Sequence, residues 1–214
     1  MLLHAPRCHN DTVTEKLKGI SGSMFAGKTE ILLKEIGRAE IAGKKVQVFK
    51  PTIDTRWDTT DHIRSHSGGE HISFSIKSPL EILDLIEPDT YLVAIDEVQF
   101  FDDSIVDVIK ILLELDVRVT FAGLSLDFRG EPFGAMPKLL ALCDEIDRPT
   151  AICNQSVNGR ICGQAATRTQ RLINGKPANY DDPIVLIGAE QEYAARCPNH
   201  HLVPGKPKSD IGKK

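Results

Sequence analysis

The sequence predicts an α/β fold, in which a mainly parallel sheet carries helices on both faces and is followed by a small second lobe. Two observations predict the sheet: short apolar runs alternate with amphipathic helical stretches, and a glycine-rich loop joins the first such run to the first such helix. The third observation predicts the lobe, because turn-rich sequence with three of the five cysteines begins at about Pro149.

The glycine-rich loop, GSMFAGKT at residues 22–29, has the spacing G-x-x-x-x-G-K-T. Upstream, KLKGIS predicts a strand that ends at Ser21. Downstream, Leu32 and Ile36 recur on one face of a helix that we expect to end near Gly43. In this context the loop N–H groups and Lys28 can surround phosphates, as in a P-loop NTPase of the RecA-like type, and Thr29 can ligate Mg²⁺. The alternative is an ordinary glycine-containing turn before a helix.

The later elements follow the same alternation. SPLEILDLIE predicts a helix with Ser78 as N-cap, and further helices are predicted over DDSIVDVIKILLELD and AMPKLLALCDEI. KKVQVFKP, TYLVAIDE and VRVTFAGL predict strands, of which TYLVAIDE is apolar enough to be buried on both faces. Ligands of such a sheet are expected at the carboxyl ends of its strands.

Composition and charge limit the class of protein. The net charge is −4 and the sequence pI is near 6.0, which argues against a protein whose main task is to bind nucleic acid. The N-terminus lacks the features of a signal peptide, and no apolar run approaches the length of a membrane span. We therefore expect a cytoplasmic protein, without membrane or nucleic-acid partners, whose cysteines bind metal or are buried rather than forming disulfides.

An acidic pair ends the strand-like run LVAIDEVQFF. Asp96 stands where a parallel-sheet NTPase places the carboxylate that helps hold Mg²⁺, and Glu97 can act as a base. The pair alone does not decide whether water or a substrate hydroxyl is activated. The alternative is that both carboxylates end the strand by facing solvent.

Six blocks of sequence together resemble one family. GSMFAGKTE, FKPTIDTRW, SHSGG, DEVQFF, FAGLSLDFRGEPFG and TRTQRL have the order and spacing of the thymidine kinases of the cellular, zinc-containing (type II) family, and IVLIGAEQEYAARC resembles their nucleoside-binding loop. The resemblance covers about residues 16–200. It implies transfer of the γ-phosphate of ATP to the 5′-hydroxyl of thymidine or deoxyuridine, a salvage reaction for DNA synthesis.

The resemblance also assigns roles to residues. Glu97 would be the catalytic base, with Mg²⁺ on Thr29 and Asp96, and Arg56 would spread charge in the transition state. The implied ATP-binding residues are Gly22, Ser23, Met24, Phe25, Ala26, Gly27, Lys28, Thr29, Asp54, Thr55, Arg56, Asp96 and Gln99. The implied nucleoside-binding residues are Met24, Phe100, Leu124, Phe128, Phe133, Thr169, Ile184, Val185, Leu186, Ile187, Gly188 and Tyr193. A homotetramer and feedback inhibition by thymidine triphosphate are further implications.

The second lobe contains half of a tetrahedral zinc site in Cys197 and His200, a C-x-x-H pair. Cys153 and Cys162 would complete it, although eight residues separate them where the family has a tight C-x-x-C. A lobe with so little core would gain folding energy from structural zinc. His201 is the alternative to His200, and a site with three ligands or no zinc is the alternative to this set. Cys143 is expected to be a thiol of the core.

These expectations divide the chain into four parts: a flexible extension at residues 1–16, a P-loop ATP-binding α/β domain at 17–148, a zinc-containing lobe with the nucleoside-binding loop at 149–204, and a flexible tail at 205–214. Two rival functions remain open. One is an ATPase stimulated by nucleic acid, in which Glu97 activates water, and the other is a zinc-bearing binding module that uses ATP only as a switch.

Overall fold

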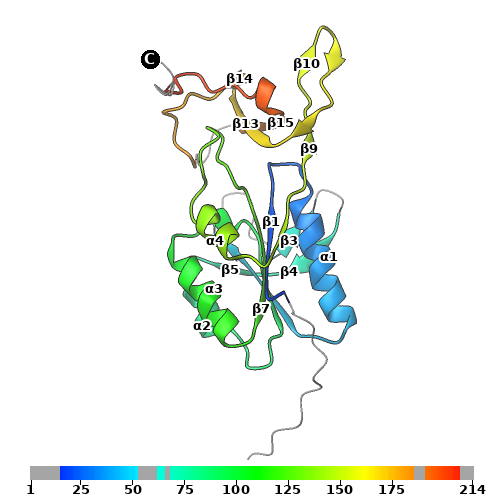
Figure 1. Cartoon of the computed structure of the whole chain (residues 1–214), viewed down its shortest axis with the longest axis vertical. Helices are drawn as coiled ribbons and strands as arrows, with labels where there is room; N and C mark the ends of the chain where they lie inside the picture. Colours follow the sequence, from blue (N-terminus) through cyan, green and yellow to red (C-terminus); the bar gives the residue numbers. More distant parts are fainter. Residues whose placement is uncertain (1–14, 53–61, 66–67, 186–190, 208–214) are drawn as a thin grey trace, which may run out of the picture.

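The computed structural model describes residues 15–52, 62–65, 68–185 and 191–207. It has an α/β layer and, at one end of that layer, a smaller lobe built from short strands (Figure 1). The chain crosses from the layer to the lobe after Asp147, the last residue of β8.

A six-stranded sheet forms the centre of the α/β layer, and all of its neighbouring strands are parallel. Its order is β5-β2-β6-β7-β1-β8. The strands are β1 (Leu17–Ser21), β2 (Val46–Pro51), β5 (Phe74–Ile76), β6 (Leu92–Ile95), β7 (Arg118–Gly123) and β8 (Glu145–Asp147). Every residue of β6 is buried, as expected for a strand covered on both faces. The predicted α/β fold is confirmed.

Helices cover both faces of this sheet (Figure 1). Alternate strand residues point to opposite faces: Ile20, Val48 and Ala94 pack in a cluster with helix α1, whereas Phe49, Ile95 and Phe121 belong to a larger cluster that includes residues of the other helices. The helices are α1 (Lys28–Ile41), α2 (Glu81–Leu85), α3 (Ser104–Glu114) and α4 (Met136–Leu142).

Two expected boundaries are corrected by the structure. The helix predicted over residues 135–146 ends at Leu142, and residues 145–147 form β8 beside β1. Lys18 of β1 explains the change, because its ammonium forms ion pairs with Glu145 at 2.9 Å and Asp147 at 3.0 Å. Helix α2 begins at Glu81 rather than directly after Ser78, although the Ser78 N–H still donates to the Glu81 carboxylate at 2.8 Å.

Short strands build the lobe. Strands β13 (Arg168–Ile173), β14 (Lys176–Pro177) and β15 (Gln191–Arg196) form an antiparallel sheet, in which β13 is central. Strands β9 (Ala151–Ile152) and β12 (Ala165–Ala166) pair with each other, as do β10 (Ser156–Val157) and β11 (Arg160–Ile161). A further hairpin, β3 (His62–Arg64) with β4 (Glu70–Ile72), belongs to the α/β layer and was not expected.

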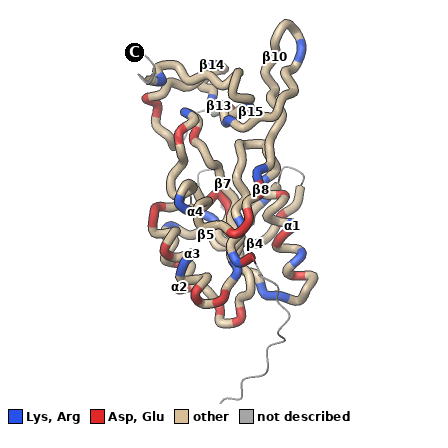
Figure 2. Tube along the Cα trace, viewed as in Figure 1, with Lys and Arg blue, Asp and Glu red and all other residues tan. Residues whose placement is uncertain are grey.

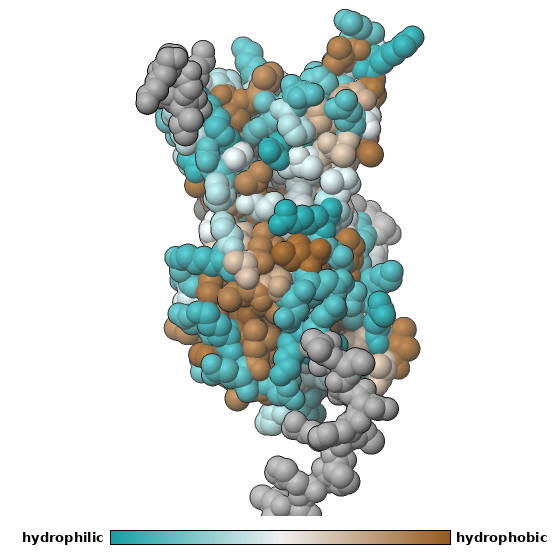
Figure 3. Space-filling model, viewed as in Figure 1, coloured by the Kyte–Doolittle hydropathy of each residue, from teal (hydrophilic) through white to brown (hydrophobic). Residues whose placement is uncertain are grey.

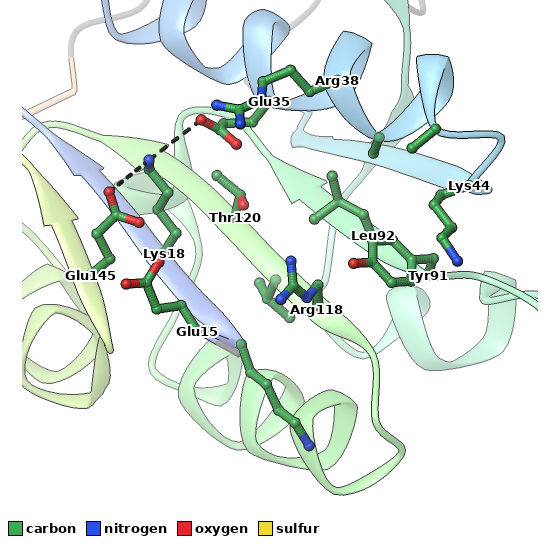
Figure 4. A pocket seen from close by; sticks show the side chains of 14 residues that line it. Glu15, Lys18, Glu35, Arg38, Lys44, Tyr91, Leu92, Arg118, Thr120 and Glu145 are labelled. Carbon is green, nitrogen blue, oxygen red and sulfur yellow. Dashed lines mark hydrogen bonds and ion pairs between the residues drawn. The ribbon is translucent and has the colours of Figure 1, made fainter. Parts of the chain in front are cut away.

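Charged residues of both signs are distributed over the helices and loops (Figure 2). On the face drawn in Figure 3, apolar side chains gather on the α/β layer and are bordered by hydrophilic ones. A hollow of about 400 Å³ opens at the amino-terminal ends of β1, β6 and β7, and its Lys18 pairs with Glu35 and Glu145 (Figure 4). Among the described residues, no helix has the length and apolarity needed to span a membrane.

Candidate active site and metal centre

The predicted phosphate loop lies between β1 and α1, and its two glycines are sterically required. Gly27 has φ +76°, in the left-handed region where only glycine is unstrained. A Cβ on Gly22 would lie 2.6 Å from the carbonyl oxygen of Pro149. Helix α1 begins at the next residue, Lys28, so its partly positive N-terminus adjoins the loop.

Lys28 and Thr29 bring a cation and a hydroxyl to this loop. The buried Lys28 ammonium donates to the Ser23 carbonyl at 3.0 Å, and burial lowers its pKa while the charges of Glu97 and Asp96 oppose that shift. The Thr29 hydroxyl donates to the Asp96 carboxylate at 3.2 Å. A hydroxyl and a carboxylate side by side are oxygen ligands of the kind that Mg²⁺ binds, so the residues fit the expected ion.

Asp96 follows β6 and is buried. Burial and the neighbouring charge of Glu97 raise its pKa to about 7, although hydrogen bonds from the Glu97 N–H and from Thr29 oppose the rise. A bound divalent cation favours the ionised form of a neighbouring carboxylate. The site is therefore arranged so that cation binding and ionisation of Asp96 favour each other.

Glu97 has an unusual backbone and a fixed side chain. Its φ of +51° lies in the left-handed region, which is uncommon for a residue other than glycine. Its carboxylate accepts a hydrogen bond of 2.5 Å from the Gln99 amide. The Gln99 side-chain oxygen in turn accepts from the Leu124 N–H at 3.0 Å.

Gln99 lies in a tight space in the short helix η1 (Val98–Phe100) and is buried. A Cβ on Gly123 would lie 2.7 Å from its side-chain oxygen, and one on Gly134 would lie 2.6 Å from its carbonyl oxygen. The two glycines thus leave room for Gln99, which fixes the direction of the Glu97 carboxylate.

An apolar pocket of about 370 Å³ opens beside Glu97. The rings of Phe100 and Phe133 meet edge to face in its wall, with centroids 5.3 Å apart. All nine expected nucleoside-binding residues that lie in the described part of the chain line this pocket: Met24, Phe100, Leu124, Phe128, Phe133, Thr169, Ile184, Val185 and Tyr193. The α/β layer and the lobe both contribute to it.

A smaller pocket of about 140 Å³ adjoins the phosphate loop and is lined by Gly27, Lys28 and Thr29. Met24 and Glu97 line this pocket and the apolar one. The two pockets therefore meet at a carboxylate, with an apolar space on one side and a phosphate-binding loop on the other.

The phosphate loop is also bonded directly to the lobe. The Ser23 hydroxyl donates to the Ala166 carbonyl at 2.9 Å, and the Met24 N–H donates to the Thr169 hydroxyl at 3.0 Å. Since Ala166 ends β12 and Thr169 lies in β13, the folded lobe fixes one side of the loop.

Four side chains of the lobe converge as a metal site: Cys153, Cys162, Cys197 and His200, whose ligand atoms all lie within 4.8 Å of one another. The Cys197 sulfur is 3.4 Å from the His200 Nδ1 and 4.0 Å from the Cys162 sulfur. Ligand atoms of a tetrahedral zinc lie roughly 3.5–3.8 Å apart, so the donor set fits structural zinc with four ligands.

A β-hairpin explains how Cys153 and Cys162 reach one metal across eight residues. Strands β10 and β11 pair around Asn158 and Gly159, both of which have positive φ. The Cys162 N–H then donates to the Gln155 carbonyl at 2.8 Å, which closes the base of the hairpin. The dipeptide Asn-Gly between short strands is a strong hairpin signal that was available in the sequence.

The choice between the two histidines is also clear. His201 is outside the metal cluster, and its Nε2 is 2.8 Å from the Phe128 carbonyl, a distance at which a protonated Nε2 donates. It therefore supports the wall of the apolar pocket, while His200 completes the metal site. Burial lowers the pKa of His201, which favours its neutral form.

Some expected site residues lie outside the described residues: Asp54, Thr55, Arg56, Leu186, Ile187 and Gly188. One residue near the pocket was missed, namely Arg171, which is fully buried. The block TRTQRL contains Arg171, but no role was assigned to it from the sequence, because an arginine in a strand is ordinarily expected to face solvent.

The model of the thymidine kinase family matches residues 15–201 of this chain. The match spans the α/β layer, both pockets and the metal cluster. Kinases of this family use ATP and Mg²⁺, for which the phosphate loop, Thr29 and Asp96 provide fitting groups. The chain therefore belongs to the thymidine kinase family and is an ATP:thymidine phosphotransferase.

Proposed function

We propose that Glu97 is the general base of the phosphotransfer and that the apolar pocket holds the nucleoside. One observation carries this proposal: Glu97 lines both the apolar pocket and the phosphate-loop pocket. A nucleoside whose base occupies the first pocket would present its 5′-hydroxyl towards the second. General-base catalysis requires this kind of reach between carboxylate and hydroxyl.

In the proposed reaction the 5′-oxygen attacks the γ-phosphorus of ATP, its proton passes to the Glu97 carboxylate, and ADP leaves. Lys28 and the N–H groups of the loop bind the phosphates, and Mg²⁺ on Thr29 and Asp96 would neutralise their charge. Gln99 acts as a positioning residue, because its side-chain amide donates a hydrogen bond of 2.5 Å to the Glu97 carboxylate. Asp54, Thr55 and Arg56 are proposed to join the phosphate site, with Arg56 spreading transition-state charge.

The proposed base site is an apolar slot with few polar side chains, of the kind that binds small planar ligands. The phenylalanines would wall the ring, and Met24, Leu124 and Thr169 would lie near the thymine methyl group. Residues 184–188 are proposed to read the base through their backbone groups, with Tyr193 beside it.

The finer properties are also proposals. Thymidine triphosphate would inhibit by filling both adjoining pockets, with its base in one and its phosphates in the other. A cytoplasmic location is supported by the four described cysteines, which are free of disulfides. The homotetramer is supported by family membership alone and is tested by light scattering of the purified protein. We also propose the four-part division at residues 1–16, 17–148, 149–204 and 205–214.

The test compares ADP release and thymidine monophosphate formation in the wild type, Glu97→Gln and a control, Glu114→Gln. Glu114 is an exposed glutamate at the end of α3 and lines neither pocket. We expect Glu97→Gln to lower kcat by roughly 10²- to 10⁴-fold with little change in KM for ATP, because only proton transfer is lost. The control variant should match the wild type.

Parallel reactions with deoxycytidine and single-stranded DNA separate the rival functions. Release of ADP that requires thymidine, and stops in Glu97→Gln, supports the proposal. Unchanged nucleoside phosphorylation in Glu97→Gln would remove Glu97 from the role of base. Stimulation of ADP release by DNA would instead favour an ATPase.

A further inference from the structure

We propose that Arg171 is a positioning residue that sets the affinity for the nucleoside from behind the pocket wall, an inference that rests on the proposed function of that pocket. Arg171 lies in β13 and is the largest fully buried side chain of the described residues. It is absent from the lining of the pocket, but it contacts residues that form that lining. A buried guanidinium is costly unless it is well paired, so its contacts call for an explanation.

The first contact is with a pocket wall. The Arg171 guanidinium carbon lies 3.6 Å from the centroid of the Phe128 ring, close enough for cation–π stacking between two buried side chains. Phe128 is buried, and its carbonyl oxygen is also bonded to His201. Arg171 therefore fixes the plane of the ring that the nucleoside would contact.

The second contact is with the segment that leads into the proposed base-reading loop. Nη1 of Arg171 donates to the Pro183 carbonyl at 2.5 Å and to the Ile184 carbonyl at 3.3 Å. Ile184 lines the pocket, and the backbone that follows it is proposed to read the base. A group that binds these two carbonyls fixes the backbone at residues 183 and 184, at the edge of the pocket.

The third observation concerns the remaining donors of Arg171 and its neighbour on β15. Nε and Nη2 of Arg171 have no hydrogen-bond partner among the described residues, although both are buried. Tyr193, which lines the pocket, pairs with Arg171 in the register of β13 and β15. Burial raises the pKa of the Tyr193 hydroxyl, and both the positive charge of Arg171 and a hydrogen bond with its side chain oppose the rise, so Arg171 also contacts this wall of the pocket.

The variant that tests this role is Arg171→Lys, which keeps the charge but loses the planar, forked donor and its stacking. Its matched control is Arg168→Lys on the same strand, since the described hydrogen bonds of the Arg168 side chain go only to Thr167. We expect Arg171→Lys to raise KM for thymidine by roughly tenfold to a hundredfold, the effect of losing a charge-assisted hydrogen bond together with the stacking on Phe128. KM for ATP should change less than about twofold, and kcat less than about threefold.

Hydrogen exchange supplies a readout that a purely structural role would not move. In the wild type, thymidine should slow the exchange of the peptide containing residues 183–185, and in Arg171→Lys the same saturation by thymidine should protect it less. Equal KM for thymidine in Arg171→Lys and the control would overturn the inference while leaving the thymidine-dependent reaction of the wild type intact. If Arg171→Lys and Arg171→Gln both fail to unfold cooperatively, Arg171 is a folding residue and the inference is also overturned.

Discussion

The α/β layer and the lobe differ in what they bury. The larger cluster of the layer contains nineteen buried apolar residues, mostly Ile, Val, Leu and Phe from strands and helices. The cluster of the lobe has five, which are three alanines, Cys153 and Cys197. Burial of large aliphatic side chains can stabilise the first region, whereas the second has too little apolar surface for that. Four converging metal ligands supply what the lobe lacks.

This difference has a functional side, because the pocket is built from both regions. Phe100, Leu124 and Phe133 come from the α/β layer, while Thr169 and Tyr193 come from the lobe. Glu97 is held from within the layer through Gln99. The machinery for phosphate transfer therefore depends on apolar packing, and the geometry of the proposed nucleoside site depends on zinc as well.

The largest expected effect comes from removing a zinc ligand. Cys162→Ser should lower the zinc content well below one per chain and reduce thymidine phosphorylation by more than about a hundredfold, because zinc binding contributes roughly 10–16 kcal/mol to the folding of small domains. Metal analysis, activity and circular dichroism measure this, and the helical signal of the α/β layer should persist. Cys143→Ala is the control, since Cys143 lies outside the cluster. A Cys162→Ser protein with full zinc content and stability would contradict the four-ligand assignment.

The next effect is a loss of stability in the α/β layer without loss of zinc. Ile109→Ala removes a fully buried side chain from α3 and should lower the free energy of unfolding by about 2–5 kcal/mol, measured by urea denaturation. Ile111→Ala on the same helix, at 39% exposure, should cost less than about 1 kcal/mol. If Ile109→Ala lost its zinc while its free energy of unfolding stayed near that of the wild type, the proposed division between the two regions would fail.

A smaller effect is expected at the bond that joins them. Ser23→Ala removes the donor to the Ala166 carbonyl and should cost roughly 1–3 kcal/mol of stability, with a rise in KM for ATP, because the phosphate loop loses one fixed side. The exposed Ser156→Ala on the β10–β11 hairpin is the control. Unchanged KM for ATP and stability in Ser23→Ala would mean that the lobe does not position the loop.

The same division explains what the sequence could predict. Apolar periodicity is a local signal, so β1, β2, β6, β7 and the helices of the layer were predicted from it. The strand β8 was not, because its acidic residues become favourable only beside Lys18, more than a hundred positions earlier in the chain. The phosphate loop and the cysteines carried spacing signals of their own.

Contacts that depend on tertiary structure account for the rest of the site. The resemblance to the family named the pocket residues, but not that Glu97 would line two pockets or that Gln99 would hold it. Arg171 lies in the block TRTQRL, but its buried position could not be predicted, since that position follows from the pairing of β13 with β15 and from the carbonyls of residues 183 and 184. The hairpin between Cys153 and Cys162 was predictable from Asn-Gly and was overlooked.

The smallest expected effect distinguishes two ways of protecting a thiol. Burial raises the pKa of Cys143 to about 11, from the ordinary 9.0, so at pH 8 its thiolate fraction is about a hundredfold lower than that of an unperturbed cysteine. Cys153 and Cys197 are buried too, but we expect zinc to be what protects them, as in other thiolate sites.

Iodoacetamide at pH 8, followed by mass spectrometry of the peptides, tests this difference. In the zinc-loaded protein it should label neither Cys143 nor the three lobe cysteines. After a chelator is added, the three lobe cysteines should react while Cys143 stays unlabelled, because the core of the α/β layer does not depend on the metal. Simultaneous labelling of Cys143 and the lobe cysteines would show that zinc supports both regions, and the contrast between them would then fail.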